Sequence, residues 1–192
     1  MIALWGIVLG LVIGLARGGS FENLGTLRLR GLPLVFLALA IQILTFPTPW
    51  WSAPPLASAA RAWHLISYAL LLVFLILNRR LVPLWGIAAG ALMNIIVIAA
   101  NHGLMPTDPH ALAASGNPAV AEALTATPGA TSGNVIAMGP NTRLDFLGDW
   151  LYLPPWVPFG DSFSPGDLVL MLGVAWLLQH AMRVRGAGTP RG

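Results

Sequence analysis

Apolar residues occur in five long runs, separated by segments rich in polar residues, glycine and proline. The runs cover residues 1–16, 32–46, 62–77, 81–100 and 168–182. Each approaches the roughly 20 residues that a helix needs to cross a hydrocarbon core about 30 Å thick, and flanking Trp, Gly and Ser can complete the spans. The pattern predicts an all-α membrane protein: one integral membrane domain over residues 1–192, built as a bundle of about five transmembrane helices.

The composition agrees with this interpretation. Apolar residues make up 56% of the chain and charged residues only 9%, whereas a soluble domain carries roughly a quarter charged residues. The net charge of +3 comes from arginines that are spread along an apolar chain, so we expect no nucleic-acid partner. The lipid bilayer is the expected partner, and a further membrane protein or another copy of the chain could be a second one.

The arginines alternate along the chain in the way that five crossings require. The segments after the first and third runs and the C-terminal tail hold eight arginines and one acid, a net charge of +7, and the other segments hold two arginines and six acids, a net charge of −4. Short loops rich in arginine stay in the cytoplasm. We therefore expect the N-terminus outside, the C-terminus in the cytoplasm, and the long loop over residues 101–166 on the extracytoplasmic side.

Tryptophan positions point to the same orientation. Six of the eight fall at or near the predicted outer face, as an interfacial aromatic belt would place them. They are Trp5, Trp50, Trp51, Trp63, Trp150 and Trp156.

Glycines at four-residue spacing predict close helix packing. Gly6, Gly10 and Gly14 form one such row in the first run, and Gly86 and Gly90 form another in the fourth. Small residues at this spacing let helix backbones approach closely. The interface can lie inside the bundle or between two protomers.

The long loop has two parts of different character. Residues 107–142 are rich in small residues, and Asp108-Pro109 and Asn117-Pro118 read as an N-cap followed by proline at the first helical position. Gly116 is placed to end the first of these helices. Residues 143–163 are aromatic and proline-rich, and we expect them to fold back over the bundle in the outer interface.

Polar residues within membrane spans are costly and are therefore functional candidates. Those in the predicted outer half of the bilayer are Gln42, His64, Ser67, Tyr68 and Asn94. They share that side with polar residues of the outer loop and its edge: Asn101, His102, Arg143, Asp145, Asp149 and Asp167. The sequence thus predicts one polar region that opens outward, and hydrogen bonding between helices is the structural alternative for each residue.

Two carboxylates near the end of the loop suggest a hydrolytic alternative. Two carboxyl groups brought together can share a proton and activate water. Asp145-Phe146-Leu147, with Phe163-Ser164-Pro165-Gly166-Asp167 at a helix start, resembles the catalytic part of lipoprotein signal peptidase over about a tenth of the chain. This resemblance implies a membrane-embedded aspartic hydrolase, for which Asp149 and Asp167 would be the pair.

Asp167 also has a structural explanation. Ser164 at the N-cap, Pro165 at the first helical position and Asp167 at the third form a capping box. Asp149 has no such explanation beyond pairing with Arg143 or Arg61, so it is the more informative of the two carboxylates.

Metal and cofactor sites find no support. His102, Asp108 and His110 are close in sequence, but they lack the spacing of known metal motifs. No glycine-rich nucleotide motif, P-loop or nucleophile elbow is present. We predict no metal and no cofactor.

Segments along nearly the whole chain resemble a bacterial family of small multi-pass membrane proteins, a domain of unknown function. They are Gly10-x-x-x-Gly14 with Arg17-Gly18-Gly19, Asn23-Leu24, Arg28, Arg30, Gln42, Asn78-Arg79-Arg80, Gly90-Ala91-Leu92-Met93-Asn94, Asn101-His102-Gly103-Leu104-Met105-Pro106, Thr142-Arg143-Leu144, Phe146-Leu147-Gly148-Asp149 and Phe163-Ser164-x-Gly166-Asp167. The family pattern has Gly at position 102 and Pro at 145. The resemblance implies a location in the bacterial plasma (inner) membrane and assigns no activity.

The family pattern places any shared function near Met105 and Pro106 and at a polar site of five residues. These five are Asn94, Asn101, Arg143, Asp149 and Asp167. The expected function is that of a binding, scaffold or accessory component with this site on the extracytoplasmic side. Whether it is an enzyme is left open, with the aspartic hydrolase as the alternative.

Overall fold

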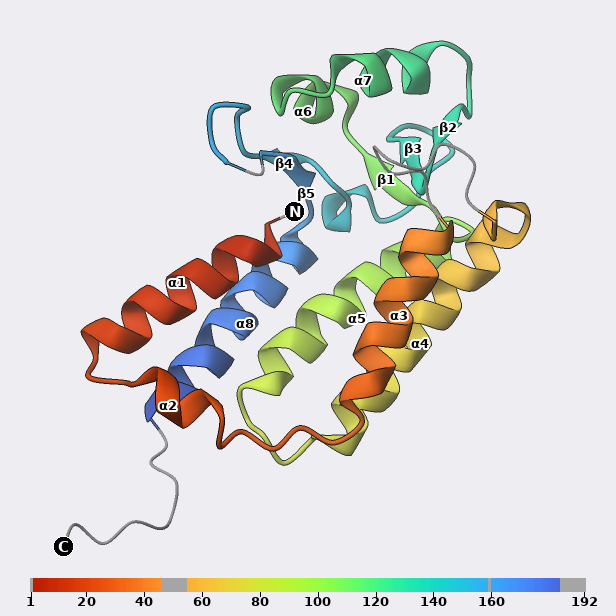
Figure 1. The fold of residues 1–192 in the computed structure, drawn as a ribbon. Helices are drawn as coiled ribbons and strands as arrows, with labels where there is room; N and C mark the ends of the chain where they lie inside the picture. Colours follow the sequence, from red (N-terminus) through yellow and green to blue (C-terminus); the bar gives the residue numbers. More distant parts are fainter. Residues whose placement is uncertain (1, 46–54, 159, 184–192) are drawn as a thin grey trace, which may run out of the picture.

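The structure, a computed structural model, describes residues 2–45, 55–158 and 160–183 and is mostly helical (Figure 1). Five long helices coincide with the five apolar runs: α1 (Ala3–Ala16), α3 (Leu32–Thr45), α4 (Ala60–Leu77), α5 (Leu84–Ala100) and α8 (Pro165–Arg183). The predicted helical class is confirmed. Met1, Phe46, Trp50, Trp51, Arg185 and Arg191, which entered the sequence-based predictions, lie outside the described residues.

Among the described helices, one is long and apolar enough by these two criteria to cross a membrane, and it is α4. Residues 4–16, 32–45 and 84–100 form shorter apolar helices. The five crossings therefore remain a prediction.

Helix ends differ from the predicted spans for local reasons. The fourth helix begins at Leu84 instead of residue 81, because Pro83 occupies the N-cap and residues 78–84 form tight turns. The last helix begins at Pro165 instead of residue 168, because Ser164 caps it.

Helix α8 packs between α1 and α5, and glycines make both contacts close (Figure 1). A Cβ atom at Gly10 would lie 2.9 Å from the Cβ atom of Leu178, and one at Gly86 would lie 3.0 Å from the Cα atom of Gly173. Both predicted glycine rows thus face α8. The interface lies inside the chain, which decides between the two alternatives that the sequence left open.

Helices α3 and α4 form a second pair, and α4 contacts α5. Phe74, Leu75, Leu84 and Ala91 are the buried residues of the α4–α5 contact. The short helix α2 (Phe21–Leu24) lies between α1 and α3 in the chain and is tied to α8, because the Asn23 side chain donates to the carbonyl of Met182 over 2.6 Å.

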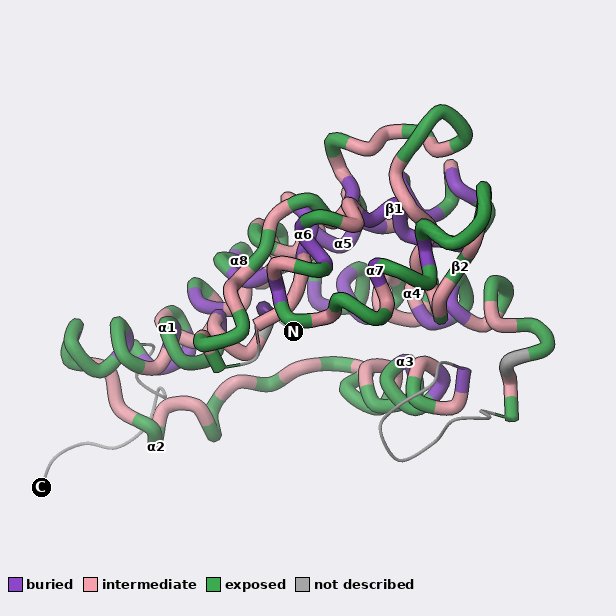
Figure 2. The backbone as a smooth tube through the Cα atoms, turned by 90° about the horizontal axis from the view of Figure 1, so that it is seen from above, coloured by how far each residue is buried: buried purple, intermediate pink, exposed green. Residues whose placement is uncertain are grey.

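Many large apolar side chains on the long helices are exposed. Figure 2 shows exposed residues along the outer sides of α1 and α3. The exposed side chains on α1, α3, α4, α5 and α8 are Ile7, Val8, Leu9, Val12, Ile13, Leu15, Leu32, Phe36, Leu37, Leu39, Ile43, Leu65, Ile66, Val73, Ile76, Leu77, Trp85, Leu92, Ile96, Leu168, Leu172 and Trp176. Monomeric soluble proteins rarely expose so much contiguous apolar surface, which marks a membrane or protein contact.

Residues 105–163 form a small mixed layer over one end of the helices, called the cap below (Figure 1). Its helices are α6 (Pro109–Ala114) and α7 (Pro118–Thr125). A three-stranded sheet has the order β1 (Met105–Thr107), β3 (Val135–Ala137), β2 (Thr131–Ser132), with β1 parallel to β3 and β2 antiparallel to it. A second, antiparallel pair joins β4 (Leu151–Tyr152) to β5 (Ser162–Phe163).

The predicted helix signals in the cap are confirmed. Asp108 caps α6 by accepting from the amide of His110 over 2.9 Å, and Asn117 occupies the N-cap of α7. Gly116 follows α6 with φ +100°, a conformation that suits glycine. The sheet was not predicted, because its strands are only two or three residues long and β1 pairs with β3 at a separation of 30 residues, Met105 with Val135.

Substitution of Gly90 tests the glycine packing. A Cβ atom there would lie 2.5 Å from the Leu170 nitrogen, and such overpacking costs about 1–3 kcal/mol. We expect Gly90→Ala to lower the thermal unfolding temperature of the purified protein. Gly25→Ala is the matched control, because its Cβ atom would have ordinary contact at 3.5 Å from Glu22 O. Equal effects of the two variants would contradict the proposed packing.

Candidate functional site

A cavity of about 750 Å³ lies between the cap and the cap-side ends of α3 and α8. The cap contributes residues from α6, α7, the β2–β3 turn and the segments around β4 and β5. The lining residues are Ile2, Gln42, Leu112, Asn117, Val120, Ser132, Gly133, Asn134, Val135, Asp149, Asp161, Ser162, Asp167 and Leu170. Three of them are carboxylic acids, and none of these described residues carries a positive charge.

Backbone hydrogen bonds hold Asp149 beside the end of β1. The amide of Asp149 donates to the carbonyl of Pro106 over 2.8 Å, and the amide of Asp108 donates to the carbonyl of Asp149 over 3.0 Å. A Cβ atom at Gly148 would collide with the Pro106 carbonyl, so only glycine permits this approach. Asp149 is therefore carried on a fixed backbone.

The Asp149 carboxyl is an unusual group. Its Oδ1 atom is buried and has no hydrogen-bond partner among the described residues. Burial, together with the negative charges of Asp167 and Asp161, raises the pKa of this carboxyl to about 8, although a hydrogen bond with the Thr107 side chain lowers it. A carboxyl that changes charge near neutral pH and faces a cavity is typical of a functional site.

Asp167 belongs to a hydrogen-bonded network at the start of α8. The Asn94 side chain donates to Asp167 Oδ1 over 2.7 Å, and the Ser164 hydroxyl donates to Asn94 Oδ1 over 2.8 Å. The amide of Asp167 donates to Ser164 Oγ over 2.9 Å, and the amide of Ser164 donates to Asp167 Oδ2 over 3.3 Å. The predicted capping box is present, and buried Asn94 ties it to α5.

Asn101 fastens the cap to the end of α5. Its side-chain nitrogen donates to the carbonyls of Val97 and Arg143, each over 2.8 Å, and its Oδ1 accepts from the amide of Arg143 over 2.8 Å. Arg143 takes part through its backbone, and its side chain is exposed. This connection begins the segment that leads to Asp149.

The structure thus separates the five predicted site residues by position. Asp149 and Asp167 line the same cavity. Asn94 does not line the cavity but donates a hydrogen bond to Asp167, and Asn101 and Arg143 hold the segment that carries Asp149.

The other polar residues of the long helices mostly make contacts between or within helices. The Gln42 side chain donates to the Ser67 hydroxyl over 3.1 Å and also reaches the cavity. His64 Nδ1 lies 3.3 Å from the carbonyl of Gly103, and its ring centroid is 5.1 Å from that of Tyr68. The described residues bring together no group of three or more His, Cys, Asp or Glu that could hold a metal ion.

Several cavity residues escaped the sequence analysis. They are Asp161, Asn134 and Ser132, and Asn117 was predicted only as a helix N-cap. Asp161 reaches the site because β4 pairs with β5 and the amide of Leu153 donates to the Asp161 carbonyl over 3.0 Å. The only signal in the sequence was the acid itself, since strands of two residues leave no periodic pattern.

A family model described as a family of unknown function, DUF5317, matches residues 26–179. The chain belongs to this family. The sequence-based expectation of a family of unknown function is confirmed. The matched residues of this DUF5317 chain include the cap, the cavity carboxylates, helices α3, α4 and α5, and most of α8. No curated protein and no solved structure matches the chain.

The raised pKa of Asp149 predicts a pH-dependent stability of the DUF5317 protein. Its pKa of about 8 in the folded protein lies above the ordinary value of 3.8. Protonation of this carboxyl therefore stabilises the folded state, and this contribution is fully present when the pH is below 3.8. The contribution is lost as the pH rises through about 8. Asp149→Asn cannot ionise and should lose less stability between pH 5 and pH 9.

Between these two pH values, we expect the unfolding temperature of the wild type to fall by roughly 2–4 °C or more beyond the fall in Asp149→Asn. This is the shift that about 1 kcal/mol produces in a chain of this size. Glu122→Gln, which removes an exposed acid of α7, controls for the general loss of one charge. Parallel pH profiles of the wild type and Asp149→Asn would show that Asp149 is not the buried, proton-binding group described above.

Proposed function

We propose that this DUF5317 protein is a multi-pass protein of the bacterial plasma membrane that binds a small organic cation in the cavity beneath its cap. Helices α1, α3, α4, α5 and α8 would cross the bilayer, and the cap and N-terminus would lie on the extracytoplasmic side. The protein would act as a binding or accessory component.

The exposed apolar side chains support the membrane part of this proposal. They occur on all five long helices, and lipid tails are the solvent in which such surfaces are stable. The helices have 14 to 19 residues, which corresponds to about 21 to 28 Å at 1.5 Å per residue. This length is slightly less than a hydrocarbon core of about 30 Å, and flanking residues or local thinning can supply the difference.

The charges support the orientation. The segment joining α4 and α5 and the segment joining α1 and α3 carry arginines at the end of the bundle away from the cap (Figure 1). Six of the seven acids lie in the cap or at the start of α8. Short arginine-rich loops favour the cytoplasmic side.

The unpartnered, buried Asp149 Oδ1 atom is the observation that carries the binding function. A buried carboxyl oxygen without a hydrogen-bond partner costs free energy, and Asp161 and Asp167 bring two more carboxyl groups to the same cavity. A ligand with an ammonium group would supply both a positive charge and hydrogen-bond donors, while Gln42 and Asn134 offer amide oxygens as further acceptors.

An aspartic hydrolase is the second candidate, because Asp149 and Asp167 line one cavity and the charge of Asp167 raises the pKa of Asp149. Such a pair must hold water between its carboxyl oxygens. Both oxygens of Asp167 already accept hydrogen bonds, from Asn94 and from the amide of Ser164. Asp167 therefore serves the helix start, and cation binding has the better support.

The proposed topology can be tested with single cysteines, because the chain contains none. We expect a membrane-impermeant maleimide to label Thr127→Cys, in the exposed cap, in intact spheroplasts. Gly25→Cys, exposed at the opposite end, should be labelled only after lysis. Equal labelling of both variants before lysis, or release of the chain from membranes by alkaline carbonate, would contradict the membrane proposal.

Putrescine is a suitable probe for the cavity. We expect titration calorimetry of the detergent-purified protein to show binding that strengthens from pH 7 to pH 9, because Asp149 ionises with a pKa of about 8 while an amine with a pKa near 10 stays charged. Asp149→Asn should weaken binding at least tenfold, about 1.4 kcal/mol.

Asp145→Asn is the matched control for this titration. It also removes a carboxyl with a buried, unpartnered Oδ1 atom, but Asp145 does not line the cavity. Equal losses in the two variants, or binding that is insensitive to pH, would count against the cavity as the binding site.

A further inference from the structure

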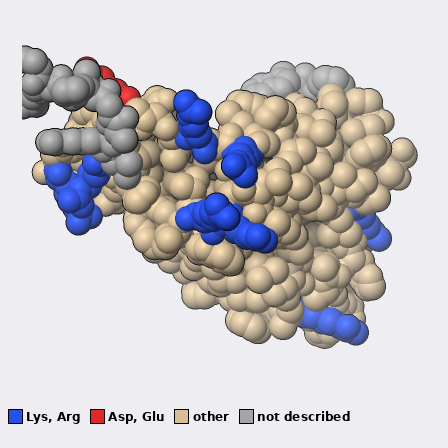
Figure 3. Space-filling model, turned by 90° about the horizontal axis from the view of Figure 1, so that it is seen from below, with Lys and Arg blue, Asp and Glu red and all other residues tan. Residues whose placement is uncertain are grey.

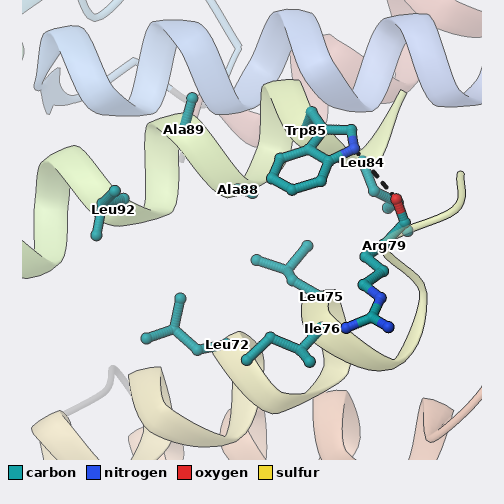
Figure 4. Close-up of a pocket in the computed structure, with 9 residues that line it drawn as sticks. All are labelled: Leu72, Leu75, Ile76, Arg79, Leu84, Trp85, Ala88, Ala89 and Leu92. Carbon is teal, nitrogen blue, oxygen red and sulfur yellow. Dashed lines mark hydrogen bonds between the residues drawn. The ribbon is translucent and has the colours of Figure 1, made fainter. Parts of the chain in front are cut away.

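A second cavity lies between α4 and α5, toward the end of the bundle that faces away from the cap (Figure 4). Its volume is about 620 Å³. The lining residues are Leu72, Leu75, Ile76, Arg79, Leu84, Trp85, Ala88, Ala89 and Leu92. All of them except Arg79 are apolar or aromatic, so this groove, called the α4–α5 groove below, suits a hydrocarbon chain.

Arg79 and Trp85 lie at the same end of the α4–α5 groove (Figure 4). The Trp85 indole nitrogen donates to the backbone carbonyl of Arg79 over 3.1 Å, which fixes the ring beside the turn that follows α4. A tryptophan and an arginine at one end of an apolar groove are the pair that favours the boundary between lipid tails and headgroups.

A basic hollow of about 470 Å³ adjoins this end of the groove. Its lining residues are Arg28, Arg30, Ile76, Leu77, Asn78, Arg79, Arg80 and Leu81, so Ile76 and Arg79 belong to both cavities. Figure 3 shows arginine side chains gathered on this face, with acidic groups confined to one edge of the view. None of the described residues that line the hollow is an acid.

Buried Asn78 brings these arginines together. Its side-chain nitrogen donates to the carbonyls of Arg30 and Phe74 over 2.7 and 2.8 Å, and its Oδ1 accepts from the amide of Arg30 over 2.8 Å. The loop with Arg28 and Arg30 is thereby held against the turn with Arg79 and Arg80. Gathering four positive charges costs free energy, and a bound anion would offset that cost.

We propose that the α4–α5 groove and the basic hollow together bind one anionic phospholipid of the cytoplasmic leaflet. The arginines bind the phosphate, for which the guanidinium fork is suited, and one acyl chain lies along the groove. From Trp85 to Leu92 the groove follows two turns of α5, about 10 Å at 1.5 Å per residue. The inference rests on the membrane part of the proposed function and is independent of cation binding under the cap.

Continuity of the two cavities favours a lipid over a free anion. Inorganic phosphate could occupy the basic hollow, but it would leave the apolar groove empty. A phospholipid fills both cavities and places its charged and apolar parts against matching surfaces. Basic pockets between helices on the cytoplasmic side recognise lipid headgroups in this way.

The test uses the full chain purified in dodecyl maltoside, with added dioleoyl phosphatidylglycerol or dioleoyl phosphatidylcholine. We expect native mass spectrometry to show one retained phosphatidylglycerol and thermal unfolding to shift upward with this lipid alone. The double variant Arg30→Gln/Arg79→Gln should lower retention at least tenfold. Ala88→Phe, which places a ring in the groove, should lower it while leaving the hollow unchanged.

Arg17→Gln is the matched control. It removes one charge at the same end of the bundle. Arg17 lines neither cavity, and its side chain instead donates to the Gln179 side chain over 3.0 Å. Equal retention of the two lipids, equal losses in Arg17→Gln and the double variant, or equal stabilisation by inorganic phosphate would each overturn the proposal. If cysteine labelling shows the predicted crossings while the two lipids bind equally, this inference alone fails.

Discussion

The close contact of α8 with α1 on one side and α5 on the other is the constraint on which the rest of the structure depends. Glycines in all three helices remove the side chains that would keep the backbones apart. In the proposed membrane setting, the hydrophobic effect between helices is weak, and close packing of this kind is a main source of helix association. Because β5 of the cap directly precedes α8, the packing of this helix also sets the position of β5 at the base of the cap.

The cap depends on this arrangement through a few buried polar groups. Asn94 on α5 holds the capping box of α8, and Asn101 at the end of α5 holds the segment that leads to Asp149. Both asparagines form hydrogen bonds with several buried backbone or side-chain groups that would otherwise lack a partner. The acidic cavity therefore forms only when α5, α8 and the cap are in place together, which suits a site that must hold an ionisable carboxyl at low solvent exposure.

The two ends of the bundle have opposite chemistry. Asp149, Asp161 and Asp167 gather under the cap, whereas Arg28, Arg30, Arg79 and Arg80 gather at the other end. At each end a buried asparagine holds a loop and so sets the position of charged groups: Asn101, at the end of α5, holds the cap, and Asn78 holds the loop that carries Arg28 and Arg30. Like charges held together by backbone contacts mark sites where a ligand of opposite charge is expected.

The sequence by itself determined the five long helices, the starts of α6 and α7, the capping box at Ser164 and the importance of Asp149, because apolar runs, caps and proline positions act over a few residues. Only the tertiary structure decided that the glycine rows face α8 and that Asp149 and Asp167 share a cavity with Asp161. It also showed that Arg143 serves through its backbone. These features depend on β-strands of two or three residues and on contacts between distant segments, for which no local pattern exists.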